Sequence, residues 1–172
     1  MTIAENTIVE LSYTLRNSDQ VVIEQMTVQW PLKFYFGSGA MLPAFEEHLR
    51  GLEQGSHFEF SIPAKDAYGT IDPALIEEVP LNQLPDSEDF PNRVYERGDH
   101  LQFSKGNQTR VGRVVEVMDN AITVDFNHSL AGEDLHFTGR IIHVRPPRAD
   151  EAVEKRYIEP NGIRSDSRLR PF

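Results

Sequence analysis

The segment TIVELSYTLR, residues 7 to 16, alternates between two faces, and this alternation limits the fold more than any other feature of the sequence. Val9, Leu11, Tyr13 and Leu15 share one face, and Ile8, Glu10, Ser12 and Thr14 share the other. Alternation over this length is typical of a half-buried β-strand. We therefore expect a strand whose Leu11, Tyr13 and Leu15 side chains point into a core.

Further strands are predicted on both sides of a single helix. NSDQ makes a turn after the first strand, and strands follow at VVIEQM (21 to 26), LKFYFG (32 to 37) and residues 57 to 62. EDLHFTGRIIHV reads as one long strand that places Leu135, Phe137, Gly139, Ile141 and His143 on a common side. The pattern therefore predicts a mostly β domain.

The helix is predicted between Pro43 and Gly51. Proline suits the first turn of a helix, acidic side chains favour its positive end, and glycine is common just beyond its last turn. Phe45 and Leu49 are four residues apart, so they should face the sheet together.

The residue composition of the chain changes after Tyr68. Residues 70 to 97 contain four prolines, and the short apolar groups ALIEEV and LNQL read as single helical turns outside any core. Three more strands are predicted at DHLQFS, TRVGRVVEVM and AITVDF, with hairpin turns at KGNQ and DN. We interpret this region as a β-rich insertion between two parts of an outer domain.

Composition and charge exclude several classes of protein. The 172 residues include no Cys, which excludes disulfides, thiolate metal sites and Cys nucleophiles. No run approaches the roughly 18 apolar residues of a membrane helix, and the start lacks a leader pattern, so we expect a soluble cytoplasmic protein without a membrane partner. Residues 1 to 145 carry eleven Lys/Arg against twenty-two Asp/Glu, a net of −11. Such a body repels phosphate backbones, and nucleic acid is not expected as a partner.

Four motifs in this order carry a resemblance to a known family. They are YTLR, GSGAMLPAFEEHLRGLEQG, AKDAYG and NHSLAGEDLHF. Together they resemble the FKBP-type peptidyl-prolyl cis-trans isomerases, in the bacterial SlyD-like branch that carries a domain inserted in the flap. Transcription-factor relatives of similar fold need a long coiled-coil arm, and the sequence has no sustained heptad pattern.

The resemblance implies an α+β fold, mostly β, with a half-wrapped antiparallel sheet around one helix and a small inserted β domain. It divides the chain into an isomerase domain (1–71 plus 127–148), an insertion that captures unfolded chains (72–126) and a C-terminal tail (149–172). The implied partners are unfolded or proline-containing polypeptides, and no cofactor is implied.

The resemblance also implies the residues of an apolar pocket. Tyr13 and Phe137 would form walls, Phe45 the floor under the proline ring, and the Tyr68 hydroxyl would orient the substrate carbonyl. Glu24 would tune the site through a hydrogen bond, with Tyr13 as the candidate donor. The remaining substrate-binding residues would be Ile23, Leu32, Met41 and Leu42. Periodicity alone favours core packing over substrate contact for Tyr13, Leu32, Phe45 and Phe137, and it is the resemblance that assigns them to the pocket. Asp66 reads as a turn carboxylate that caps backbone N–H groups.

Two departures from the family pattern bear on activity and metal binding. Ala44 stands where the family usually has Gly, and Phe45 where it has Leu or Trp, which changes the depth of the floor. No His follows His143, so the metal-binding tail of some family members is not carried over, and no metal site is predicted.

Two functions therefore compete. The first is a prolyl isomerase with chaperone activity, in which the insertion hands X-Pro bonds to the pocket. The second is a non-catalytic holdase or assembly module on the same scaffold.

The tail beyond Arg148 is outside the resemblance. DEAVEKRYIE could form a short helix, and the rest reads most simply as a mobile end. A sharper hypothesis is that Tyr157, Ile158 and Pro160, or Arg170, Pro171 and Phe172, dock on an apolar groove of this or a neighbouring molecule, the latter giving self-association.

Overall fold

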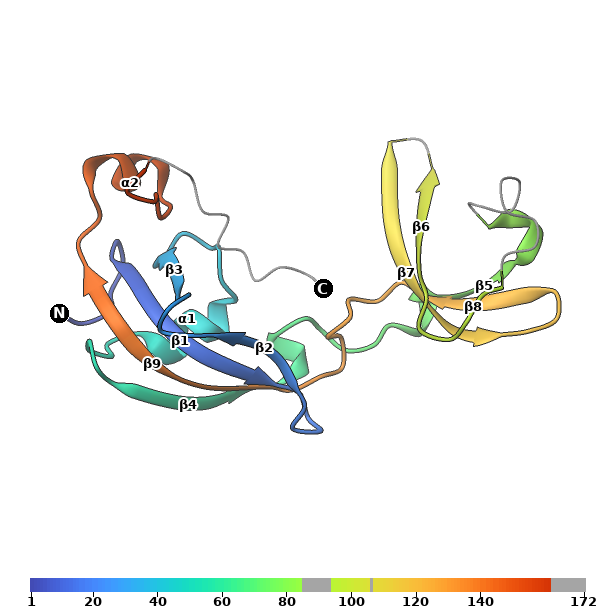
Figure 1. Ribbon diagram of the computed structural model, residues 1–172, viewed down its shortest axis with the longest axis horizontal. Coiled ribbons are helices and arrows are strands. Elements are labelled where there is room, and N and C mark those ends of the chain that lie inside the picture. The colour runs from blue at the N-terminus through green and yellow to red at the C-terminus, as the bar shows by residue number, and fades with distance from the viewer. Residues whose placement is uncertain (85–93, 106, 162–172) are drawn as a thin grey trace. The chain divides into compact units, whose positions relative to one another are not determined.

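The chain divides into two compact units in a computed structural model that describes residues 1–84, 94–105 and 107–161 (Figure 1). The first unit combines Met1–Thr70 with the chain from Leu130 onward, and the second is Ile71–Ser129. Each unit has its own sheet and its own buried cluster.

The first unit is built on a five-stranded antiparallel sheet. Its strands are β1 (Ile8–Arg16), β2 (Val22–Met26), β3 (Leu32–Tyr35), β4 (His57–Ile62) and β9 (Leu135–Arg145). The order is β2-β1-β9-β4, and β3 pairs with the first half of β1 while β2 pairs with the second half. Leu11, Tyr13 and Leu15 are all buried, so the predicted inward face of the first strand is confirmed.

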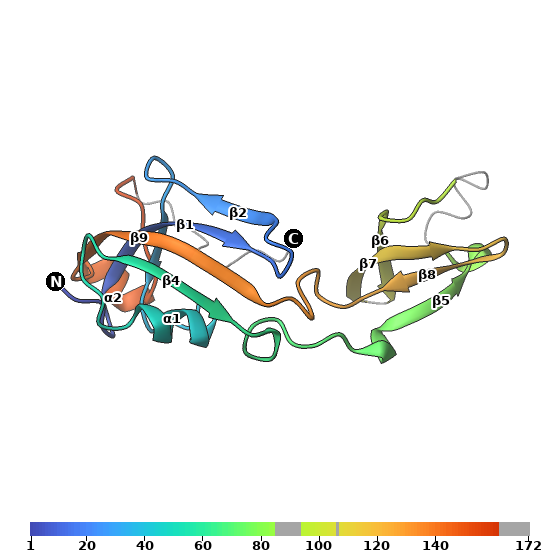
Figure 2. The same cartoon turned by 90° about the horizontal axis from the view of Figure 1, so that it is seen from below.

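One helix, α1 (Pro43–Leu49), lies along one face of this sheet (Figure 2). Phe45 and Leu49 are fully buried in the same cluster as the inward residues of β1. The chain leaves the helix through Gly51, whose φ of +80° lies in the left-handed region that glycine tolerates without strain. The predicted bounds and inner face of the helix are confirmed, as is the predicted α+β fold class.

The long strand β9 contains an irregularity that the sequence pattern missed. Glu10 pairs with His143, but Leu11 pairs with Ile141, so one residue of β9 is skipped at this point. A bulge of this kind reverses the alternation beyond it. Beyond the bulge it is Val144, not His143, that is buried in the core. His143 lies on the opposite face of the sheet, where its Nδ1 is 4.0 Å from the Glu10 carboxylate. The prediction that His143 shares a face with Phe137 is wrong.

The second unit is a four-stranded antiparallel sheet with the order β5-β8-β7-β6. Its strands are β5 (Ile76–Pro80), β6 (His100–Lys105), β7 (Gln108–Val117) and β8 (Ala121–Asp125). Leu101, Val114, Ile122 and Val124 form its buried centre together with Leu84.

The strand β5 was not predicted, because Pro73 and Pro80 indicated turns in this part of the sequence. Short 3-10 turns do occur at Pro73–Leu75 and Leu81–Gln83, but Ile76–Pro80 is an edge strand that pairs with β8. An edge strand tolerates proline because one row of its backbone groups is not paired. The prediction of helical turns outside the core is therefore wrong for residues 76–80, and also for Leu84, which is buried.

The C-terminal segment packs on the first unit. Helix α2 (Ala149–Glu154) follows β9, and Tyr157 and Ile158 are each only 4% exposed. Tyr157 packs on Ile8 and Tyr35 of the same chain. The short helix suggested within residues 150–159 is present at Ala149–Glu154. The docking hypothesis holds for Tyr157 and Ile158, on this molecule itself, but not for Pro160, which is exposed. The mobile end expected beyond residue 159 lies outside the described residues from 162 onward. Arg170, Pro171 and Phe172 lie outside the described residues.

Candidate active site

Aromatic rings from the sheet and the helix converge on Phe45 of α1. The Phe45 ring centroid lies 4.9 Å from that of Phe137 on β9, 5.8 Å from that of Phe60 on β4 and 6.3 Å from that of Tyr13 on β1. Tyr13 and Phe137 also contact each other, with centroids 5.7 Å apart. Tilted and edge-on contacts at these separations are favourable, so the rings hold one another in defined orientations.

All nine site residues predicted from the sequence belong to this cluster or to its border. Five of them are buried: Tyr13, Leu32, Met41, Phe45 and Phe137. The other four, Ile23, Glu24, Leu42 and Tyr68, are only partly buried. A ligand that approaches this border therefore meets Ile23, Leu42, Tyr68 and the Glu24 carboxylate before it reaches the rings beneath.

Glu24 and Tyr13 are joined by a hydrogen bond. The Tyr13 hydroxyl donates to Oε2 of Glu24, which is the donor that the sequence reasoning suggested. Burial is the largest cause that raises the pKa of Tyr13, and the hydrogen bond to Glu24 raises it further. The Tyr13 hydroxyl therefore remains protonated and serves as a fixed donor to the carboxylate.

Tyr68 reaches the cluster through the tight turn that follows β4. The chain forms a 3-10 turn at Ala64–Asp66, and Gly69, with a φ of +82°, returns its N–H to the Ala64 carbonyl at 2.8 Å. Burial raises the pKa of Tyr68, and the negative charge of Glu24 adds to this effect. The Tyr68 hydroxyl is therefore held in its neutral, proton-donating form.

Asp66 does not have the capping role that was predicted for it. Among the described residues its carboxylate accepts no hydrogen bond; the Ala64 N–H instead donates to Oδ1 of Asp134 at 2.9 Å. The cap comes from a residue 70 positions away, which local turn chemistry cannot reveal.

The loop before α1 is fixed by a buried carboxylate. Glu46 is 8% exposed, and its Oε2 accepts the Gly37 N–H at 3.2 Å. Burial raises the pKa of Glu46. Because Met41 and Leu42 lie between Gly37 and the helix, this bond helps to place both side chains at the cluster.

Sequence reasoning missed Phe60, whose ring contacts both Phe45 and Phe137. Its ring centroid is 5.4 Å from that of Phe137, and the His48 ring stacks on it at 4.4 Å. The signal was present, because Phe58, Phe60 and Ile62 alternate along β4. Phe34 on β3 was placed only as a strand residue, and its centroid is 6.3 Å from that of Phe45.

The arrangement suits binding and orientation of an apolar group. The rings of Tyr13, Phe34, Phe45, Phe60 and Phe137 form its apolar interior, of which all but Phe60 are buried, and the polar groups at its border are the Tyr68 hydroxyl and the Tyr13–Glu24 pair. Such a site can exclude water and present a hydroxyl donor to a carbonyl, without needing a covalent intermediate.

Comparison with known proteins shows similarity to one enzyme family. Residues 1–88 match the family model described as FKBP-type peptidyl-prolyl cis-trans isomerase. The chain is 33% identical over 151 residues to the FKBP-type peptidyl-prolyl cis-trans isomerase SlyD of Treponema pallidum, covering 88% of this chain and 83% of the relative. It is 30% identical to SlyD of Escherichia coli K12, covering 88% and 74% of the two chains.

A shorter archaeal relative is also similar. The short-type peptidyl-prolyl cis-trans isomerase of Methanocaldococcus jannaschii is 32% identical over 120 residues, which cover 70% of this chain and 71% of the relative.

In the described part of the chain, neither helix is long and apolar enough to cross a membrane.

Proposed function

The chain belongs to the FKBP-type peptidyl-prolyl cis-trans isomerase family, in its SlyD-like branch, and we propose that the cluster around Phe45 is the pocket in which it isomerises X-Pro bonds. The observation that carries this proposal is the convergence of Tyr13, Phe45 and Phe137 beneath a border that contains Tyr68 and Glu24. These residues come from five different elements of the chain (β1, β2, α1, the turn after β4 and β9), and folding brings them together.

The chemistry that such a pocket must supply is modest. Rotation about a peptide bond faces a barrier of roughly 18–20 kcal/mol because resonance joins C and N. Resonance is lost in the twisted transition state, so the carbonyl oxygen carries less charge than in the planar amide. An apolar pocket that excludes water therefore favours the twisted state over the planar one. Each 1.36 kcal/mol of this preference accelerates the reaction about tenfold.

We assign the roles from the position of each side chain. The Phe45 ring is the floor for the proline ring, with Tyr13 and Phe137 as walls, and Leu32, Met41, Leu42 and Ile23 complete the apolar lining. Tyr68 donates its hydroxyl to the substrate carbonyl. Glu24 holds the Tyr13 ring in place through their hydrogen bond. Burial, with the negative charge of Glu24 adding to it, raises the pKa of both tyrosines and keeps them protonated.

Removal of one hydroxyl tests this assignment. We expect Tyr68→Phe to lower kcat/KM for a short X-Pro peptide about two- to tenfold, since a net hydrogen bond is worth about 0.5–1.5 kcal/mol. Tyr95→Phe, which removes a hydroxyl from the second unit, is the matched control and should leave peptide turnover unchanged. Equal turnover by wild type and Tyr68→Phe would remove Tyr68 from the mechanism.

The alternative of a non-catalytic binding module is tested by the wild-type protein alone. An isomerase accelerates the proline-limited slow phase when a test protein refolds, whereas a pure holdase slows refolding or only prevents aggregation. A slow phase that is unaffected by wild type at catalytic amounts would refute the enzymatic function.

We further propose that the second unit binds unfolded polypeptides and passes them to the pocket. Its sheet exposes apolar side chains in the described residues: on β7 Val111 is 55% exposed and Val117 45%, and on β5 Ile76 is 39% exposed. Apolar side chains displayed on a small sheet suit weak capture of extended hydrophobic segments. Capture raises the local concentration of X-Pro bonds near the pocket. We place this activity in the cytoplasm, which fractionation of cells expressing the protein would test.

The capture model predicts a selective loss when the second unit is removed. The chain enters and leaves this unit at adjacent points, because the Asp72 N–H donates to Oδ1 of Asn127 at 2.9 Å. A short glycine linker can therefore replace residues 72–126. We expect this variant to lose acceleration of protein refolding while it retains turnover of short peptides. Equal losses in both assays would refute the transfer of substrate.

A further inference from the structure

Strand β3 is a weakly supported part of the proposed pocket. It has four residues, and in the described part of the chain it pairs only with β1. Its inner face carries Leu32 and Phe34, which belong to the buried cluster around Phe45. A strand this short, with one paired edge, gains little stability from its backbone hydrogen bonds to β1 alone. We therefore expect β3 to separate from β1 at a low free-energy cost.

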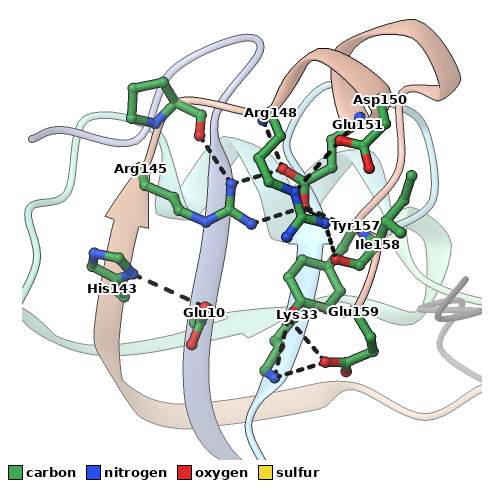
Figure 3. A network of polar contacts seen from close by, with 11 residues as sticks. Glu10, Lys33, His143, Arg145, Arg148, Asp150, Glu151, Tyr157, Ile158 and Glu159 are labelled. Carbon is green, nitrogen blue, oxygen red and sulfur yellow. Dashed lines mark hydrogen bonds and ion pairs between the residues drawn. The ribbon is translucent and has the colours of Figure 1, made fainter. Parts of the chain in front are cut away.

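The C-terminal segment contacts the outer face of the same strand (Figure 3). Nζ of Lys33 donates to the Tyr157 hydroxyl at 3.3 Å, lies 3.5 Å from the Glu159 carboxylate and sits 5.1 Å above the centre of the Tyr157 ring. The Tyr157 side chain also packs on Tyr35, the last residue of β3. β3 is therefore held between the pocket cluster on one side and Tyr157 on the other.

The segment is itself anchored by one buried carboxylate. Glu151 is fully buried, and its two oxygens accept from both terminal nitrogens of Arg145, at 2.7 and 2.8 Å (Figure 3). They also accept the backbone N–H of Arg148 at 2.8 Å and of Ile158 at 3.3 Å. A buried carboxylate with this many donors has a single favourable geometry, so Glu151 fixes α2 and the chain at Ile158 onto the end of β9.

We propose that residues 149–159 form a C-terminal clamp that positions β3 for catalysis. The clamp holds Lys33 and Tyr35 on the outer face of β3. It thereby keeps Leu32 and Phe34, on the inner face, packed in the cluster around Phe45. The segment thus acts as a positioning element of the enzyme, through β3, and contacts no substrate itself. This inference rests on the proposed pocket, since it assigns the clamp an effect on that site.

The competing explanation is that the segment only covers Ile8 and Tyr35 and adds stability. The two explanations differ in the activity of molecules that are folded. If the clamp only stabilises, a weakened clamp lowers the folded fraction but leaves kcat/KM per folded molecule unchanged. If it positions β3, then kcat/KM falls even well below the melting temperature, mainly through a higher KM, because a displaced wall weakens substrate binding.

The test uses the full chain with Tyr157→Ala, and Val153→Ala as the matched control. Val153 is on α2 of the clamp but is 83% exposed. At a temperature where circular dichroism shows all variants folded, we expect Tyr157→Ala to lower kcat/KM for a short X-Pro peptide about five- to tenfold, the lower end of the usual coupling between two sites. The Leu32 methyl resonances should shift in Tyr157→Ala and not in Val153→Ala.

A second variant completes the test. Lys33→Met keeps a long side chain but removes both polar contacts with the clamp, and it should reproduce part of the loss. Folded Tyr157→Ala and Lys33→Met proteins with wild-type kcat/KM would refute the clamp while leaving the isomerase function intact. An inactive wild type would instead overturn the isomerase function, and the clamp with it.

Discussion

The Tyr13 hydroxyl donates a hydrogen bond to the Glu24 carboxylate, and this bond joins the two strands β1 and β2 at the border of the aromatic cluster. Tyr13 is 2% exposed whereas Glu24 is only partly buried, so the bond connects the buried rings to the accessible edge. It fixes the Tyr13 ring, which contacts both Phe45 and Phe137.

This bond should contribute measurable coupling to stability. Hydrogen bonds to charged groups are worth about 1.5–3 kcal/mol, and partial exposure of Glu24 reduces this to about 1–2 kcal/mol. We expect that coupling energy in a double-mutant cycle of Tyr13→Phe and Glu24→Gln, measured by urea unfolding. Thr14 and Gln25 are the matched pair, since Nε2 of Gln25 contacts the Thr14 hydroxyl at 3.3 Å between the same strands. A Tyr13–Glu24 coupling no larger than that of Thr14 with Gln25 would contradict the prediction.

Stability should fall at alkaline pH because the folded chain holds the Tyr13 proton. Burial, followed by Glu24, raises the pKa of Tyr13 above its ordinary value of 10.0. The unfolded chain releases this proton first, so the stabilisation is complete below pH 10 and is lost progressively as the pH rises above it. Free energies of unfolding between pH 9 and 11 should fall with a slope that Tyr13→Phe reduces. The same slope in both proteins would show that Tyr13 does not cause it.

The Glu151 carboxylate predicts a second pH dependence, at the acid end. Hydrogen bonds from Arg145 and from the Arg148 and Ile158 backbone outweigh the cost of burial and lower the pKa of Glu151 from 4.5 to about 2. A lowered folded pKa gives stability that is present above pH 4.5 and is lost as the pH falls toward 2.

Glu151→Gln should remove this contribution at neutral pH. It leaves the Arg145 guanidinium without its carboxylate, and the expected cost in the free energy of unfolding is about 3 kcal/mol, at the lower end for breaking a buried pair because the Arg145 side chain is 22% exposed. Asp150→Asn is the control, because the Asp150 side chain is 53% exposed. Urea unfolding at pH 7 and pH 3 compares the variants; a Glu151→Gln protein that matches wild type at pH 7 would refute the anchoring role.

Two glycines allow each unit to be weakened separately. A Cβ at Gly112 on β7 would lie 2.3 Å from Cγ1 of Val124, and a Cβ at Gly139 on β9 would lie 2.2 Å from the Ser12 backbone oxygen. Overpacking costs about 1–3 kcal/mol, and Gly139→Ala should lie at the upper end because the backbone cannot move aside as a side chain can.

The two variants should impair different activities. We expect Gly112→Ala to weaken protection of the second unit in hydrogen exchange and to impair refolding assistance, with short-peptide turnover retained. Gly139→Ala should weaken the first unit and lower peptide turnover. Loss of peptide turnover in folded Gly112→Ala protein would contradict the division of labour between the units.

Local patterns in the sequence predicted most of the helices and strands. The alternation of Leu11, Tyr13 and Leu15, and the spacing of Phe45 and Leu49, each follow from a repeat within one element, and the structure confirms both. The family motifs brought Glu24 and Tyr68 into consideration, because neither residue stands out from its neighbours by periodicity. The hydrogen bond between Glu24 and Tyr13 was anticipated on that basis and is present.

The errors arose where one segment depends on a distant one. The skipped residue in β9, which turns His143 outward, depends on pairing with β1 more than 130 residues away in sequence. The strand at Ile76–Pro80 forms because β8 offers it an edge, against the local signal of its prolines. Asp134 rather than Asp66 caps the turn before Tyr68 for the same reason.

By itself the sequence determined most of the strands of this protein, the helix that carries Phe45 and the family to which its motifs belong, because those features are encoded over a few neighbouring residues. Only the tertiary structure decided that Glu151, a charged residue in a polar tail, is fully buried and that Tyr157 supports β3 from behind. Burial of a carboxylate is favourable only when donors surround it, and those donors meet only after β9, α2 and the chain at Ile158 have come together.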